Sequence, residues 1–233
     1  MNLFYVSDFS GKIGDLIHIE GDDAHHIDRV LRLNAGEGLI ISNGKGNWAI
    51  GKIRNVSKKM VDIEITKVGS ETKQDLQISV AQAITKSDRA KETIELLTAS
   101  GVDEIIPWKA ARSIGKEATK WEVTSVEAGK QSRRFWLPVI SEEQNINSLA
   151  NIAKDFDQIL ICHESASEPI SKVARKAKKT LIVIGPEGGL TNEEIEELKK
   201  VNGETVRLGR PILRSAHAGI AAVSAVSALI GNW

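Results

Sequence analysis

The chain has 233 residues, of which 41% are apolar and 27% charged, and its 31 lysines and arginines balance 31 aspartates and glutamates. This length allows one large or two small domains, and the zero net charge excludes any argument for nucleic-acid binding from bulk charge. A single cysteine, Cys162, excludes an internal disulfide and is typical of a reducing compartment. We recognise no signal peptide or membrane-spanning run, so we expect a cytoplasmic protein.

The first part of the chain shows short strand patterns separated by tight turns. We predict strands at residues 16–19, 38–42, 48–56 and 60–68, with a glycine- and asparagine-rich turn at 43–47. Strands of this length and spacing are typical of a small β-barrel. The first domain is therefore predicted to be a β-barrel over residues 1–70.

One helical segment interrupts these strands at residues 22–31. Its spacing places three apolar residues on one face, namely Ile27, Val30 and Leu31. Asp22 or Asp23 is the expected N-cap, because a short acidic side chain can accept hydrogen bonds from the free N–H groups of the first turn.

A polar segment at residues 69–75 is the best candidate for a linker, and beyond it strands alternate with helices. Strands are predicted at residues 76–83, 105–106, 135–140, 158–162, 181–184 and 205–208. Helices are predicted at residues 88–100, 119–132, 146–154, 170–178 and 215–230. One more helix follows a capping box formed by Thr191 and Glu194. This alternation predicts an α/β domain over residues 75–233, with a parallel sheet covered by helices on both faces.

The last predicted helix, residues 215–230, is rich in alanine and apolar around nearly its whole circumference. A helix of this kind is buried. It could be buried in its own domain or against a partner subunit, and the sequence allows both.

The most informative stretch is a glycine-rich turn at residues 185–189, with the sequence Gly-Pro-Glu-Gly-Gly. It joins the apolar strand 181–184 to the helix that Thr191 opens. In open α/β sheets, ligands bind at the carboxyl ends of strands, and glycines let the backbone approach a ligand closely. The spacing matches neither the GxGxxG fingerprint nor a Walker A loop. A plain tight turn is the alternative, but three glycines and an acidic residue after so apolar a strand favour a small-molecule site.

Positive charge gathers in two segments despite the neutral total. Residues 107–134 carry seven lysines and arginines against three glutamates, and residues 172–179 carry five basic residues and no acidic one. Both segments are candidates for nucleic-acid contact, with solvated helix faces as the alternative. We predict no metal site, because histidines, cysteines and carboxylates do not occur at ligand spacing. His217, alone on the last helix, is better explained as a core or interface residue than as a catalyst.

Four stretches together resemble the RsmE-type 16S ribosomal RNA uridine N3-methyltransferases, which belong to the SPOUT superfamily of knotted S-adenosylmethionine enzymes. The stretches are residues 25–32 (HHIDRVLR), 85–89 (TKSDR) with Gly101-Val102, 127–134 (EAGKQSRR) running on to Pro138, and 184–189 (IGPEGG) with Leu208-Gly209 and 212–214 (ILR). The resemblance covers nearly the whole chain in order. GPEGG followed by LG and ILR at this spacing is fairly specific.

The chain departs from the family pattern just after the Leu-Gly pair. The family usually has Pro-Arg where this chain has Arg210-Pro211, and Thr-Glu-Thr where it has Ser215-Ala216-His217. The hydroxyl is kept at residue 215 but the carboxylate is lost at residue 216. A role that the family gives to that glutamate is therefore not available to Ala216.

The resemblance implies a PUA-like, RNA-binding β-barrel followed by a SPOUT domain with a deep trefoil knot at its C-terminus. It also implies a homodimer whose sites lie at or near the interface, which would account for the apolar last helix. The implied cofactor is S-adenosylmethionine, held by two loops of the knot and by the end of the preceding strand. The implied cofactor-binding residues are His163, Ile184, Gly185, Pro186, Gly188, Gly189, Leu208, Gly209, Ile212 and Leu213.

The resemblance further implies methylation of a uridine N3 atom in small-subunit ribosomal RNA. N3 is a poor nucleophile until its imide proton leaves, so the enzyme must take that proton and stabilise the charge on the flanking carbonyls. We expect Arg89, Glu187 and Arg214 to be catalytic, with Glu187 as general base or as a group that orients the uracil ring. A helix cap is the alternative role for Glu187. The candidate RNA contacts are Arg29, Arg32, Lys86, Gln131, Arg133 and Arg134.

Two other functions stay open. One is a SPOUT methyltransferase with another RNA target, such as a ribose 2′-hydroxyl. The N-terminal barrel and residues 127–134 favour uridine N3 over that target. The other is a non-catalytic RNA-binding protein that has kept the fold, which the changes at Ala216 and His217 leave possible.

Overall fold

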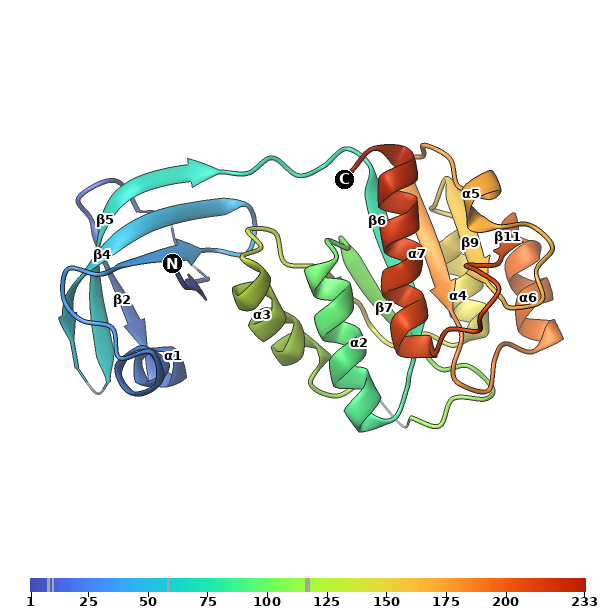
Figure 1. Ribbon diagram of the computed structural model, residues 1–233, viewed down its shortest axis with the longest axis horizontal. Helices are drawn as coiled ribbons and strands as arrows, with labels where there is room; N and C mark the ends of the chain where they lie inside the picture. Colours follow the sequence, from blue (N-terminus) through green and yellow to red (C-terminus); the bar gives the residue numbers. More distant parts are fainter. Residues whose placement is uncertain (8, 10, 58, 116–117) are drawn as a thin grey trace. The chain divides into compact units, whose positions relative to one another are not determined.

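The computed structural model describes residues 1–7, 9, 11–57, 59–115 and 118–233. Lys116 and Glu117 of the basic 107–134 segment, and Lys58 in a predicted turn, lie outside the described residues. The chain divides into two compact units (Figure 1), Met1–Lys73 with Gly129–Leu137 and Gln74–Ala128 with Pro138–Trp233. Among the described residues, none of the helices combines the length and the apolar character needed to cross a membrane.

The first unit is built on a five-stranded sheet in the order β1-β3-β4-β5-β2. Its strands are β1 (Leu3–Tyr5), β2 (Leu16–Glu20), β3 (Gly38–Ser42), β4 (Asn47–Val56) and β5 (Met60–Ser70). β1 and β3 are parallel, and the other neighbours are antiparallel. The four predicted strands are confirmed. In the described part of the chain the sheet has edges at β1 and β2, so it is a half-barrel.

The predicted helix at residues 22–31 has two parts, α1 (Gly21–His25) and the π-helical segment η1 (His26–Leu31). Ile27 is fully buried, but Val30 is 62% exposed, so the prediction for Val30 was wrong. A π-helical turn rotates each residue less about the axis than an α-helical turn, which moves Val30 off the buried stripe. The predicted N-cap was also wrong, because the cap is Glu20, without a side-chain hydrogen bond.

The predicted strand at residues 135–140 is mostly absent, and only β8 (Val139–Ile140) forms. Residues 135–137 belong to the first unit instead. There Phe135 stacks on Trp48 with ring centroids 5.5 Å apart, and the Trp136 indole donates to the backbone carbonyl that follows β5 at 2.8 Å. Aromatic packing therefore outweighs strand pairing in this segment.

The second unit contains a six-stranded, fully parallel sheet in the order β11-β9-β10-β6-β7-β8. Besides β8, its strands are β6 (Gln77–Ala83), β7 (Glu104–Trp108), β9 (Gln158–Cys162), β10 (Lys179–Ile184) and β11 (Gly203–Val206). This confirms the predicted α/β architecture. The last strand ends at Val206, two residues before its predicted end, so Leu208 lies in the loop that follows.

Helices cover both faces of this sheet. One apolar layer includes residues of α2 (Ser87–Ala99), α3 (Trp121–Ser132), α5 (Ile170–Val173) and α7 (Ser215–Ile230). The other includes residues of α4 (Ile146–Ala153) and α6 (Asn192–Lys199). Alternate residues of β10 serve the two layers, Ile182 facing the first and Leu181 the second. Figure 1 shows α2 and α7 side by side on one face of the sheet.

The predicted basic helix at residues 170–178 is α5, which already ends at Val173. Its end is fixed by the buried side-chain amide of Gln158, which donates to the Val173 carbonyl at 3.0 Å and accepts from the Arg175 N–H at 3.1 Å. These backbone groups are then not available to a further helical turn. Residues 174–178 consequently lead into the amino end of β10 as irregular chain.

Helix α7 has the predicted bounds, and one of its faces is buried within its own unit. The opposite face is partly open in the single chain, where Leu229 is 46% exposed. His217 is exposed, with its Nε2 3.3 Å from the Glu92 carboxylate. The prediction of a core position for His217 was therefore wrong, and an interface position stays a prediction.

Candidate active site

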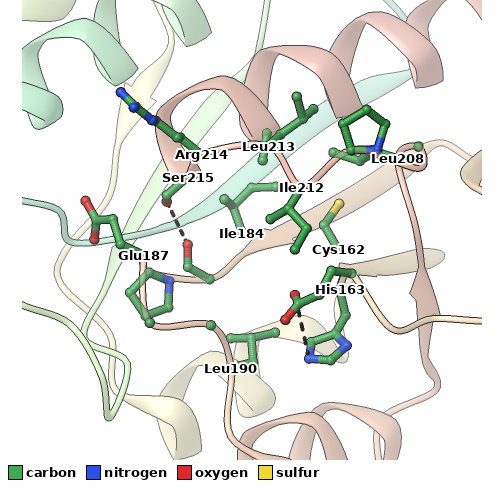
Figure 2. A pocket seen from close by; sticks show the side chains of 18 of the residues that line it. Cys162, His163, Ile184, Glu187, Leu190, Leu208, Ile212, Leu213, Arg214 and Ser215 are labelled. Carbon is green, nitrogen blue, oxygen red and sulfur yellow. Dashed lines mark hydrogen bonds and ion pairs between the residues drawn. The ribbon is translucent and has the colours of Figure 1, made fainter.

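A cavity of about 370 Å³ lies at the carboxyl ends of β11, β9 and β10, which are neighbours in the sheet (Figure 2). Its lining comes from residues 162–164, 184–190 and 208–215, and from Ala218 on α7. Parallel α/β sheets bind ligands at this edge, and the volume suits a small molecule. All ten residues predicted to bind the cofactor line this one cavity.

The glycines give the turn after β10 its shape. Gly189 has a φ of +72°, which residues with a side chain rarely adopt. At Gly185 a Cβ atom would lie 3.0 Å from the Leu190 side chain, and at Gly188 it would lie 3.1 Å from that of Arg112. A side chain at Gly185 would therefore crowd Leu190, at the end of the same loop, and one at Gly188 would crowd Arg112.

The start of α6 is closed to a phosphate group. The Thr191 hydroxyl accepts from the Glu194 N–H at 3.2 Å, and the Glu194 carboxylate accepts from the N–H groups of Thr191 at 2.8 Å and Ala111 at 2.7 Å. This is the predicted capping box, and it occupies two of the donors that a phosphate would need, the N–H groups of Thr191 and Glu194. Hydrogen bonds from its own N–H and from Thr191 lower the pKa of Glu193, so a negative charge also stands here.

Apolar side chains form much of the cavity wall. Figure 2 shows Ile184, Ile212 and Cys162 pointing toward one another across the cavity. Ile212 is 77% exposed and Leu213 41% exposed, which is unusual for apolar residues beside a cavity and calls for a covering group. Burial raises the pKa of the Cys162 thiol to about 12, so this side chain stays neutral. The wall suits a ligand with apolar surface and no phosphate, which is a property of S-adenosylmethionine.

Two of the three predicted catalytic residues line the cavity. Figure 2 shows Glu187 and Arg214 on one side of it and His163 on the other. Glu187 and Arg214 are exposed, and neither side chain forms a hydrogen bond or ion pair within the described residues. His163 is held by the Ser165 hydroxyl, 2.8 Å from its Nδ1. A carboxylate and a guanidinium are thus available together at one rim.

The third predicted catalytic residue, Arg89, does not line the cavity. It lies on α2 and forms an ion pair of 3.2 Å with Glu92, one turn further along the same helix. Glu92 also accepts a hydrogen bond from His217 of α7. The bonds from His217 and then Arg89 lower the pKa of Glu92. Arg89 therefore belongs to an exposed cluster that joins α2 to the first turn of α7.

Five of the six predicted RNA contacts lie in the first unit, and Lys86, the N-cap of α2, lies in the second. The Lys130 ammonium lies 2.6 Å from the Asp23 carboxylate, which links the end of α3 to α1. Two of the stretches that resemble the family therefore meet in the first unit, namely residues 25–32 and the 129–134 part of the stretch 127–134. The predicted RNA contacts on these two stretches are Arg29, Arg32, Gln131, Arg133 and Arg134.

Sequence reasoning missed three residues next to the glycine turn. Arg112, in the loop after β7, donates from Nη1 to the Gly188 carbonyl at 2.9 Å. Ser215 donates to the Gly185 carbonyl at 2.6 Å and accepts from Gln82 at 3.0 Å. The signal was present for all three, because each follows or ends a strand whose carboxyl end lies at the same edge of a parallel sheet.

Known proteins resemble this chain along its whole length. A family model for the RNA methyltransferase domain matches residues 72–227, and one for the RNA methyltransferase PUA domain matches residues 19–66. Ribosomal RNA small subunit methyltransferase E of Mycobacterium tuberculosis is 30% identical over 99% of this chain and 93% of its own length. The Bacillus subtilis protein of the same name is 31% identical over 90% and 88%.

Solved structures agree with these sequence matches. A putative methyltransferase from Legionella pneumophila, in complex with the bound cofactor SAM, superposes with a TM-score of 0.89 at 26% identity, covering 97% of this chain and 96% of its own. A Neisseria gonorrhoeae ribosomal RNA small subunit methyltransferase E bound to S-adenosyl methionine shares the fold, with a TM-score of 0.89, 23% identity and 98% coverage of each chain. The chain therefore belongs to the ribosomal RNA small subunit methyltransferase E family.

Proposed function

We propose that this protein methylates the N3 atom of a uridine in 16S ribosomal RNA, with S-adenosylmethionine as methyl donor. The single observation that carries the proposal is the cavity at the ends of β9, β10 and β11, in a chain whose relatives are methyltransferases of small-subunit ribosomal RNA. One related structure above 25% identity holds the same cofactor.

The cavity residues suit this cofactor. Ile184, Ile212 and Leu213 offer apolar walls, and the turn from Gly185 to Gly189 offers backbone at close range. When bound, S-adenosylmethionine supplies an electrophilic methyl group on a sulfonium. Because the cofactor is cationic near the reacting atom, a wall with a neutral Cys162 and with Glu187 nearby does not oppose its binding.

The side chains of this protein must then accept the imide proton of the uridine and stabilise the charge that its loss leaves on the ring. Glu187 is assigned the role of general base, because its carboxylate lies at the rim without a partner among the described residues and the family's glutamate is replaced by Ala216. Arg214, on the same side of the cavity, is assigned the cation that stabilises charge on the flanking carbonyl oxygens. Arg89 stays a prediction of the same kind, with its guanidinium paired to Glu92.

RNA contact is assigned to the half-barrel domain, residues 1–70, and the chemistry to residues 75–233. Sequence-specific recognition needs the target base unstacked, and folded RNA needs phosphate contacts further out. Arg29, Arg32 and the end of α3 are the proposed contacts in the first unit. The 172–179 segment leads into the amino end of β10, about 20 Å from the cavity. We therefore interpret it as a solvated surface and not as an RNA contact.

The proposal also includes a homodimer and a knotted cofactor site. The partly open face of α7, with Leu229 exposed, is proposed to meet a second copy in a homodimer. The loops 185–189 and 208–214 are proposed to belong to a trefoil knot that wraps the cofactor. A cytoplasmic location fits a substrate that is ribosomal RNA.

Mass spectrometry of nucleosides tests the central claim. Small subunits lacking the modification are incubated with the protein and S-adenosylmethionine, and the RNA is digested and analysed. We expect 3-methyluridine. Appearance of a 2′-O-methylated nucleoside instead would favour the other SPOUT target. No methylated product, together with no binding of S-adenosylmethionine in calorimetry, would leave the non-catalytic RNA-binding protein.

A further inference from the structure

A relay of two hydrogen bonds connects the interior strand β6 to the glycine turn. Gln82, near the carboxyl end of β6, donates from Nε2 to the Ser215 hydroxyl at 3.0 Å. Ser215, the first residue of α7, donates to the Gly185 carbonyl at 2.6 Å. Figure 2 shows the second bond at the edge of the cavity. The relay therefore joins three segments that are far apart in the sequence.

The direction of the relay is fixed by the chemistry of its groups. A serine hydroxyl has one hydrogen, and here it goes to Gly185, so the Ser215 oxygen must accept. Gln82 can supply a hydrogen only from its amide nitrogen, whose second hydrogen goes to the Ala83 carbonyl at 3.2 Å. The other end of the amide, Oε1, is buried and has no partner among the described residues. Gln82 is thus oriented through its amide nitrogen, by Ser215 and Ala83, and not through its own oxygen.

This arrangement is unfavourable for stability alone. Gln82 is 1% exposed, and a buried oxygen without a hydrogen bond destabilises the fold. Space for the amide is also limited, because a Cβ atom on Gly219 of α7 would lie 3.3 Å from Oε1. An apolar side chain of the same size would fill the position without an unpaired oxygen. The relay to Ser215 gives a reason for a glutamine here.

Ser215 fixes the end of the loop at residues 209–214. Residues 209–214 are exposed, whereas Ser215 is buried at the point where the loop enters α7. Gly185 begins the turn on the other side of the cavity. The bond between Ser215 and Gly185 therefore sets the separation of the two loops that line the cavity.

We propose that Gln82 and Ser215 are positioning residues for the cofactor. Gln82 holds the Ser215 hydroxyl, Ser215 holds the Gly185 carbonyl, and the two loops are thereby preorganised to close on S-adenosylmethionine. The inference rests on the proposed function, because it requires this cavity to be the cofactor site.

Calorimetry of S-adenosylmethionine binding to four variants tests the relay. Ser215→Ala is expected to weaken binding about tenfold, because the Gly185 carbonyl loses its partner, and Gln82→Met about threefold, because the hydroxyl loses only its orientation. The double variant should bind as Ser215→Ala does, since Gln82 acts only through Ser215. Ser215→Thr keeps the hydroxyl and should bind within about twofold of the unmodified protein.

Thr180→Val is the matched control. Thr180 is another fully buried residue whose hydroxyl lacks a partner among the described residues, but it lies at the amino end of β10, away from the cavity. Its replacement should change thermal stability without changing cofactor affinity. Steady-state kinetics add a second readout, because the relay variants should raise the KM for S-adenosylmethionine and leave the KM for RNA unchanged. A purely structural role would not produce that selectivity.

The outcomes separate the inference from the proposed function. If the unmodified protein does not bind S-adenosylmethionine, the proposed function fails first. If the unmodified protein binds S-adenosylmethionine, and Ser215→Ala and Gln82→Met both bind it with the same affinity as that protein, the relay is overturned and the proposed function stands. Additive losses in the double variant would also overturn it, by showing that Gln82 acts on its own. Should the Gln82 variant fail to fold, the contrast between Ser215→Ala and Ser215→Thr still decides the role of the hydroxyl.

Discussion

The two ends of the parallel sheet differ in how their polar groups are satisfied. At the amino ends, side chains close the strand starts, as where Asp103 accepts the Ile78 N–H and Asp157 accepts the Lys179 N–H, each at 2.9 Å. Ser141 likewise donates to Glu104 at 2.5 Å. At the carboxyl ends, the lining of a cavity includes exposed apolar side chains and charged side chains that have no partner among the described residues. The comparison teaches that the first end is built for stability and the second is completed by a ligand.

The largest expected effect is at the carboxyl end, from Glu187→Gln. Loss of a general base typically costs about 100-fold or more in turnover, because N3 then keeps its proton. The measurement is kcat for methylation across a range of pH, with S-adenosylmethionine binding checked separately. Glu197→Gln, on the exposed side of α6 in an ion pair with Lys200, is the control and should leave turnover unchanged. Equal turnover of Glu187→Gln and the unmodified protein at all pH values would refute the assignment.

A pH effect is expected from Cys162, whose pKa burial raises from 9.0 to about 12. The unfolded chain ionises this thiol at lower pH than the folded chain does, so its contribution to stability is complete below pH 9 and is lost as the pH rises toward 12. The loss is up to about 1.4 kcal/mol per pH unit in that window. Denaturant unfolding at pH 7 and pH 10 should show a smaller difference for Cys162→Ala than for the unmodified protein. Equal differences would mean that the thiol is solvated.

Sequence patterns located the carboxyl end well because its signals are local. The capping box of Thr191 and Glu194 and the start of α7 each depend on a few adjacent residues, and the parallel sheet then brings the strand ends together. The ten cofactor residues that the family resemblance implied all line the cavity at this edge.

The failures have the opposite cause, because each depends on a partner distant in sequence. The Gln158 amide ends α5 by binding the Val173 carbonyl, fifteen residues further along the chain. Phe135 belongs to the first unit because it stacks on Trp48. Arg112 and Gln82 were missed in the same way, since their partners lie about 76 and 133 positions away. The end of a strand places Arg112 and Gln82 at this edge of the sheet, but no periodicity within a segment shows which group each side chain holds.

Arg112 offers a smaller test of the comparison. Its Nη1 holds the Gly188 carbonyl from the outside, so Arg112→Ala should weaken S-adenosylmethionine binding about fivefold, as expected for a hydrogen bond from a charged group at an exposed site. Arg175→Ala is the control at the amino ends. Arg175 is also exposed and is paired with Glu204 at 2.7 Å, and its loss should leave cofactor affinity unchanged. If both variants weakened S-adenosylmethionine binding equally in calorimetry, the two ends of the sheet would not differ in their contribution to the cofactor site.

The smallest expected effect is from Lys176→Glu, in the 172–179 segment. This segment lies at the amino end of β10, about 20 Å from the cavity, and RNA bound at the cavity would feel its charge only weakly at physiological salt. Affinity for small-subunit RNA should change by less than about twofold. Arg133→Glu, at the end of α3 in the first unit, should instead weaken binding about tenfold and flatten its salt dependence. If both reversals act alike, the amino ends also contact RNA, and the two ends of the sheet share the substrate.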